Sequence, residues 1–62
     1  MLNIKNLIAR RNYCVTGTAS DGGEVKLFLL NYTEWERRTE WDDILARSPI
    51  LRVIQIQHWR AQ

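Results

Sequence analysis

The residues best suited to covalent chemistry in this chain are its one cysteine, Cys14, and its one histidine, His58. A cysteine thiolate beside a histidine base is a common pair in nucleophilic catalysis. No catalytic signature surrounds Cys14, and His58 lies in a polar stretch near the C-terminus. The two side chains can meet only if the first and third predicted strands are neighbours. We therefore predict that Cys14 is a small structural residue, that His58 is an exposed or edge-strand side chain, and that the chain is not an enzyme.

Metal and cofactor chemistry has little support in the sequence. One cysteine and one histidine exclude a Cys-based zinc site and an internal disulfide. The acids Glu40, Asp42 and Asp43 share a short helical segment, but they lack the glycine and alternating ligands of a calcium loop, so we interpret them as a solvated helix face. The turn at Asp21 precedes a strand and not a helix, so no helix dipole favours phosphate there. We expect no metal and no cofactor.

Basic side chains alternate with aromatic ones along the predicted strands. The net charge of +2 and the pI of about 9.1 are too small a bias to identify a nucleic-acid binder. Arginines and aromatics on strands can nevertheless form a stacking platform for single-stranded nucleic acid, although the RNA-recognition-motif pattern is absent. This alternative function would use a basic β-hairpin, with site residues Arg10, Arg11, Lys26 and Tyr13.

Three tryptophans in 62 residues are more aromatic surface than so short a domain can easily bury. Trp41 forms a stripe at helical spacing with Ile44 and Leu45, so we assign it to the core. Trp35 lies in the first helical turn and Trp59 near the end of the chain, and both positions favour a rim or an interface. Tryptophan and arginine are enriched in binding hot spots.

Local signals place the elements that must position these residues. Asp21-Gly22 between two apolar runs predicts a β-hairpin with strands over residues 7–18 and 24–32, the first few residues being a frayed start or an extension of the first strand. Thr33 followed by Glu36 is a capping box that starts a helix, and Ser48-Pro49 ends it. Residues 50–59 then form a third strand. The whole chain, 1–62, is predicted as one domain.

The predicted order ββαβ gives a two-layer α+β fold, with a three-stranded, mostly antiparallel sheet and one helix on one face. We expect the second strand in the centre because it is apolar on both faces; the third strand lying antiparallel beside the first is the alternative. One helix covers one face only. Phe28, Leu30 and Tyr32, or else their odd-numbered neighbours, should therefore stay uncovered and mark an interface.

These features favour a small, non-enzymatic protein-binding module that acts as a regulator or inhibitor. Self-association as a homodimer could also cover part of the exposed sheet face. The chain has no signal peptide and no run of about 18 apolar residues, so we expect a cytoplasmic protein without membrane contact. Read as a complete short reading frame, it resembles, in size and style alone, phage or mobile-element accessory proteins such as anti-CRISPR and other host-takeover inhibitors. The predicted protein-binding residues are Trp35, Trp59, Phe28, Tyr32, Arg52 and Arg60.

Overall fold

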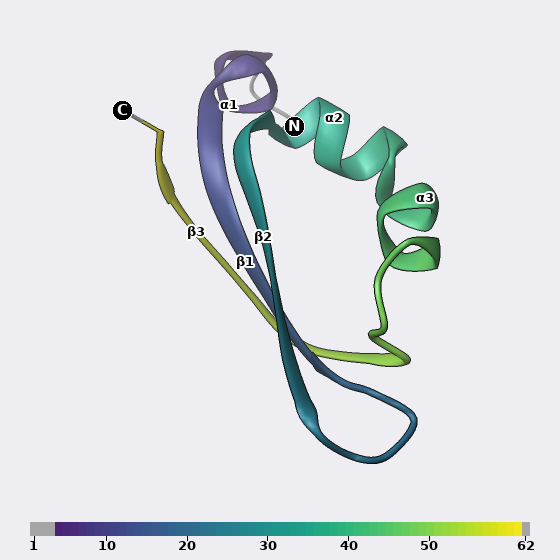
Figure 1. Cartoon of the computed structure of the whole chain (residues 1–62). Coiled ribbons are helices and arrows are strands. Elements are labelled where there is room, and N and C mark those ends of the chain that lie inside the picture. The colour runs from purple at the N-terminus through teal and green to yellow at the C-terminus, as the bar shows by residue number, and fades with distance from the viewer. Residues whose placement is uncertain (1–3, 62) are drawn as a thin grey trace.

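A three-stranded antiparallel sheet with short helices forms the domain, as the sequence predicts (Figure 1). The computed structural model describes residues 4–61. The strands lie in the order β2-β1-β3, and β1 is antiparallel to both neighbours. In chain order the elements are α1 (Ile4–Ile8), β1 (Arg10–Thr18), β2 (Glu24–Thr33), α2 (Glu34–Thr39), α3 (Trp41–Ala46) and β3 (Arg52–Arg60).

The hairpin turn between β1 and β2 is confirmed. Gly22 has a φ of 82°, which glycine adopts without a steric penalty. The Asp21 carboxylate accepts a hydrogen bond from the backbone N–H of Gly23 at 2.8 Å, and the Ala19 N–H donates to the Gly23 carbonyl at 2.9 Å. The turn residues that the sequence encodes therefore set where β1 ends and where β2 begins.

The start of the first strand was predicted too early. Residues 4–8 form α1, and the Ala9 N–H donates to the Lys5 carbonyl at 3.1 Å, which closes a helical turn. Lys5 and Leu7 are good helix formers, and this local preference outweighs the strand pattern that residues 7 and 8 seem to continue. The expectation for residues 1–3 lies outside the described part of the chain.

The expectation of β2 in the centre is wrong, and the alternative arrangement is the one that forms. The apolar second face of β2 is simply left uncovered, so it does not indicate a central strand. β3 instead lies beside β1, where Gly17 permits a close approach: a Cβ at this position would collide with the Arg52 carbonyl oxygen and the Ile50 side chain. The central strand buries Tyr13 and Val15 almost completely.

The single predicted helix is two short helices that meet at Glu40. Its start is confirmed: Thr33 accepts from the Glu36 N–H at 3.0 Å, while Glu36 accepts from the Thr33 N–H at 2.9 Å. At the junction the Thr39 hydroxyl donates to the Trp35 carbonyl at 2.9 Å, a side-chain bond of the kind that competes with regular helix bonding. The second helix ends before Ser48-Pro49, also as predicted.

The core lies between one face of the sheet and the helices. It consists of Tyr13, Val15, Leu29 and Ile50, with Trp41 and Ile44 of α3 among the residues packed against it. The prediction that Trp41 contributes to the core is thus confirmed. In Figure 1 both α2 and α3 lie to one side of the strands, and within residues 4–61 no helix covers the opposite face of the sheet.

A bulge near the end of β2 changes which way Tyr32 points. Asn31 has a positive φ of 61°, its N–H donates to the Asn12 side chain at 2.9 Å, and its carbonyl accepts from Arg10 at 3.0 Å. The register with β1 shifts here, so the alternation of side chains is interrupted. Tyr32 therefore packs against the core, and not on the uncovered face with Phe28 and Leu30 as predicted.

Candidate functional site

The face of the sheet opposite the helices carries the largest exposed apolar side chains of the strands. Cys14 of β1 is paired with Phe28 of β2 and Gln57 of β3, so these three side chains share one face, opposite that of Tyr13. Leu30 and Trp59 follow at the same alternation. We call these five residues the open face: Cys14, Phe28, Leu30, Gln57 and Trp59. Phe28, Leu30 and Trp59 are 56%, 65% and 45% exposed.

Cys14 occupies the middle of the open face but is itself only 6% exposed, because its neighbours on both sides shield it. The open face is therefore closed to solvent at its centre. His58 lies on the other face, since its cross-strand partner is Tyr13 and the two rings have centroids 5.9 Å apart. Although β1 and β3 are neighbours, Cys14 and His58 point to opposite sides of the sheet and cannot form a catalytic dyad.

The predicted protein-binding residues separate into different surfaces. Phe28 and Trp59 both lie on the open face, whereas Trp35 is 60% exposed on α2, on the helical side of the molecule. Arg52 starts β3 opposite Thr18, near the hairpin end, and Arg60 lies at the other end of the strand opposite Arg11. Tyr32 packs against the core, Phe28 and Trp59 share the open face, and Arg60 lines a hollow next to Trp59.

The residues predicted for nucleic-acid binding do not share a surface either. Tyr13 is 1% exposed, which leaves its ring no room to stack on a base. Lys26 lies near the hairpin turn, far along β2 from the end where Arg10 and Arg11 lie. The Arg10 guanidinium is held by the Asn31 carbonyl and by the Glu36 carboxylate, each at 3.0 Å. Of the four residues, Arg10 and Arg11 line one hollow together with other basic groups, and Arg10 is the one of these two that forms an ion pair.

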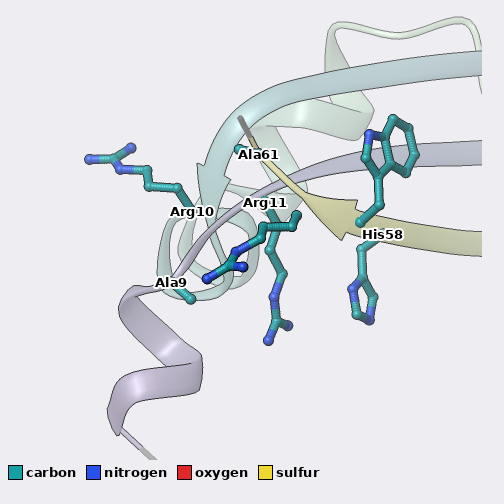
Figure 2. Close-up of a pocket in the computed structure, with 7 residues that line it drawn as sticks. Ala9, Arg10, Arg11, His58 and Ala61 are labelled. Carbon is teal, nitrogen blue, oxygen red and sulfur yellow. The ribbon is translucent and has the colours of Figure 1, made fainter.

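That end of the sheet forms a hollow of about 670 Å³, which we call the basic pocket (Figure 2). β1 contributes Arg11 and β3 contributes His58 and Arg60, with the Arg10 side chain extending away from the other labelled residues in Figure 2. Sequence reasoning missed this grouping because it arises only when β3 pairs with β1. The lining residues are Ala9, Arg10, Arg11, His58, Trp59, Arg60 and Ala61.

On the helical side, two other arginines, Arg37 and Arg38, form ion pairs with Glu34. Arg37 donates to Glu34 at 2.6 Å and stacks over the rings of Tyr13 and Trp41, with centroid distances of 5.7 and 5.3 Å. Arg38 pairs with the same carboxylate at 3.4 Å. Burial alone would raise the pKa of Glu34, but Arg37 and then Arg38 outweigh it and lower that pKa. Burial, followed by the negative charge of Glu34, raises the pKa of Tyr13.

Within residues 4–61, no three His, Cys, Asp or Glu side chains gather where they could hold a metal ion. No helix in this part of the chain has the length and apolar character needed to cross a membrane. Comparisons with protein-family models, with curated proteins and with solved structures found nothing that matches this chain.

Proposed function

We propose that this chain is a non-enzymatic protein-binding module whose contact surface is the open face. The observation that carries the proposal is the exposure of Phe28, Leu30 and Trp59 together on a sheet face that no described helix covers. Large apolar side chains exposed together on one face of a domain often mark a site of interaction.

The composition of the open face supports this proposal. Its aromatic residues stand on the two outer strands: Phe28 lies beside the shielded Cys14, and Trp59 lies opposite Asn12, one alternation further along the sheet. Gln57 and the neighbouring Gln55 add neutral hydrogen-bonding groups. Protein interfaces typically have aromatic residues and few charges at their centre, and polar groups around their rim.

The size of the exposed surface supports it as well. The molecule exposes 4851 Å² of surface, whereas a compact monomer of its 7.4 kDa mass would expose about 4,200 Å². The radius of gyration is 12.3 Å, against about 10.6 Å for a compact domain of this length. An elongated domain with excess surface gains more than a compact one by burying that surface against a partner. A regulatory or inhibitory role stays a prediction.

The test compares three variants of the tagged protein as bait in extracts, followed by binding measurements with each purified partner. Phe28→Lys and Trp59→Lys should each weaken binding to the partner at least tenfold, since each places a charge in an apolar contact. Trp35→Lys is the matched control, because it changes an equally exposed aromatic residue outside the open face, and it should bind as the wild type does.

Circular dichroism and urea unfolding would verify that all three variants are folded. Unchanged affinity of the purified partner for both open-face variants would overturn the proposal, as would a loss confined to Trp35→Lys. Light scattering separates self-association: a wild-type dimer that Phe28→Lys converts to a monomer would make a second copy, and not a different protein, the occupant of the face.

A further inference from the structure

We infer that the basic pocket is a binding site for a phosphate group, with Arg11 and Arg60 as its principal ligand residues and His58 beside them. The principal ligand residues lie on the opposite face of the sheet from Phe28 and Cys14, and Trp59 is the one residue that belongs to both the open face and the lining of the pocket.

The first argument is the pairing of like charges. Arg11 and Arg60 are direct cross-strand partners, and two cations placed opposite each other weaken a sheet. Among the described residues, the ion pairs of this protein involve Arg10, Arg37 and Arg38, and none of them involves Arg11 or Arg60. Within residues 4–61, no carboxylate lines the pocket. An anion between the two guanidinium groups would satisfy both charges.

The second argument is that the backbone carrying these groups is held in place. His58 stacks at a tilt of 47° on the buried ring of Tyr13, which fixes the position of its imidazole on this face. The backbone of Arg11 and Arg60 is set by the β1–β3 ladder, and the Ala61 N–H donates to the Arg10 carbonyl at 3.3 Å, which extends the pairing to the end of the pocket. Donors on rigid strands lose little entropy when a ligand binds.

The third argument concerns the class of ligand. Each guanidinium presents several N–H donors in a planar fork that matches the oxygens of a phosphate, and such charge-assisted hydrogen bonds are stronger than neutral ones. Two forks facing one hollow suit a tetrahedral dianion better than a single carboxylate. Arg10 is excluded as a principal ligand residue because its guanidinium is already held by Asn31 and Glu36.

The experiment is a titration of the whole protein with inorganic phosphate, followed by backbone amide chemical shifts, at an ionic strength kept constant with sodium chloride. We expect saturable shifts concentrated in residues 10–11 and 58–61. Arg11→Gln and Arg60→Gln should each lower the affinity about ten- to a hundredfold, the range for a charged hydrogen bond. The matched control is Arg52→Gln, which removes an exposed arginine from the other end of β3 and should bind phosphate as the wild type does.

Thermal unfolding gives a second readout that does not depend on detecting the ligand. Without phosphate and at low salt, Arg60→Gln should melt at a higher temperature than the wild type, because it removes the like-charge pair. Added phosphate should then raise the melting temperature of the wild type and of Arg52→Gln, and leave that of Arg60→Gln unchanged. Phe28→Lys should respond to phosphate as the wild type does, which keeps this test separate from that of the open face.

A parallel titration with a short single-stranded oligonucleotide identifies the source of the phosphate. Binding that is tighter than that of inorganic phosphate and is lost in Arg60→Gln would assign the site to a nucleic-acid backbone; binding of inorganic phosphate alone would assign it to a small phosphorylated ligand. The inference is overturned if chloride at equal ionic strength produces the same shifts, or if Arg11→Gln and Arg60→Gln both bind phosphate as tightly as the wild type.

Discussion

At the residue scale, Gly17 is the position where packing depends most on the absence of a side chain. It lies in the central strand, and the register between β1 and β3 shifts next to it, where the chain entering β3 passes close to its backbone. The Leu51 N–H donates to the Thr18 carbonyl at 2.8 Å, which ties that incoming segment to β1. The close approach at Gly17 thus lets the third strand join the sheet.

We therefore predict that Gly17→Ala destabilises the protein by roughly 1–3 kcal/mol, the usual cost of forcing extra volume into a packed site. The added methyl group would displace the Arg52 backbone or the Ile50 side chain. Gly23→Ala is the control, since its Cβ would meet only the flexible Asp21 side chain. Urea unfolding measures both variants, and equal losses of stability would show that the contact at Gly17 is not special.

At the element scale, the capping box joins β2 to α2. Thr33 is the last residue of the strand and the cap of the helix, and the reciprocal bonds with Glu36 satisfy two backbone N–H groups there. The Thr33 backbone N–H, then its hydroxyl group, lower the pKa of Glu36 below its usual value near 4.5. The carboxylate of Glu36 also reaches Arg10 of β1, so the cap holds the helix against the sheet.

Removing the cap should destabilise the domain. We predict a loss of about 1 kcal/mol for Thr33→Ala, within the range of roughly 0.5–2 kcal/mol measured for N-caps. Thr39→Ala provides a comparison at the other end of α2, where the hydroxyl group bonds a carbonyl instead of an orphan N–H, so its loss should be smaller. A larger loss at Thr39 in urea unfolding would contradict this ranking.

The lowered pKa of Glu36 also predicts a pH dependence. The folded state holds the Glu36 proton less tightly than the unfolded chain, so this contribution to stability is complete well above pH 4.5 and is lost as the pH falls through the lowered pKa. Glu34, whose pKa is also lowered, acts in the same direction. The urea midpoint should therefore fall between about pH 6 and pH 3, and it should fall less in Glu36→Gln. An identical pH profile for that variant would refute this assignment.

At the scale of the whole molecule, the fully buried core is small. Among the described residues, the buried cluster consists of Tyr13, Val15, Leu29 and Ile50, and most of β3 is exposed. A chain of this length seldom gains more than about 3–5 kcal/mol from one hydrophobic core. Neither a disulfide nor, within residues 4–61, a cluster of metal-ligating side chains supplements it.

We accordingly predict a free energy of unfolding no greater than roughly 5 kcal/mol for the isolated chain, measured by urea denaturation at neutral pH. The value should be independent of protein concentration if the chain is a monomer. A concentration-dependent midpoint would instead show that subunit contacts supply part of the stability.

Much of this fold follows from local sequence signals. The turn at Asp21, the cap at Thr33 and the stop at Pro49 each depend on the conformational preferences of single residues, so they can be predicted without the tertiary structure. The exposure of Phe28 and Trp59 was also predictable, because a layer of helix can cover only one side of a sheet.

The strand order and the basic pocket could not be predicted in this way. Apolar residues on both sides of β2 fit a central strand and equally an edge strand with an open face. The positive φ of Asn31 turns Tyr32 toward the core, an effect that regular alternation cannot anticipate. Arg11 and Arg60 come from opposite ends of the chain, and only the β1–β3 pairing brings them together.

The central position of β1 has a further consequence for the order in which the protein is made and folded. The β1–β2 hairpin and helices α2 and α3 are complete in the chain before β3 is synthesised. At that stage one edge of the central strand β1 still lacks its partner. β3 can dock only when residues 52–60 have left the exit tunnel. We expect mutations in β3 to accelerate unfolding more than they slow folding, whereas mutations in the hairpin turn should chiefly slow folding, which stopped-flow kinetics would reveal.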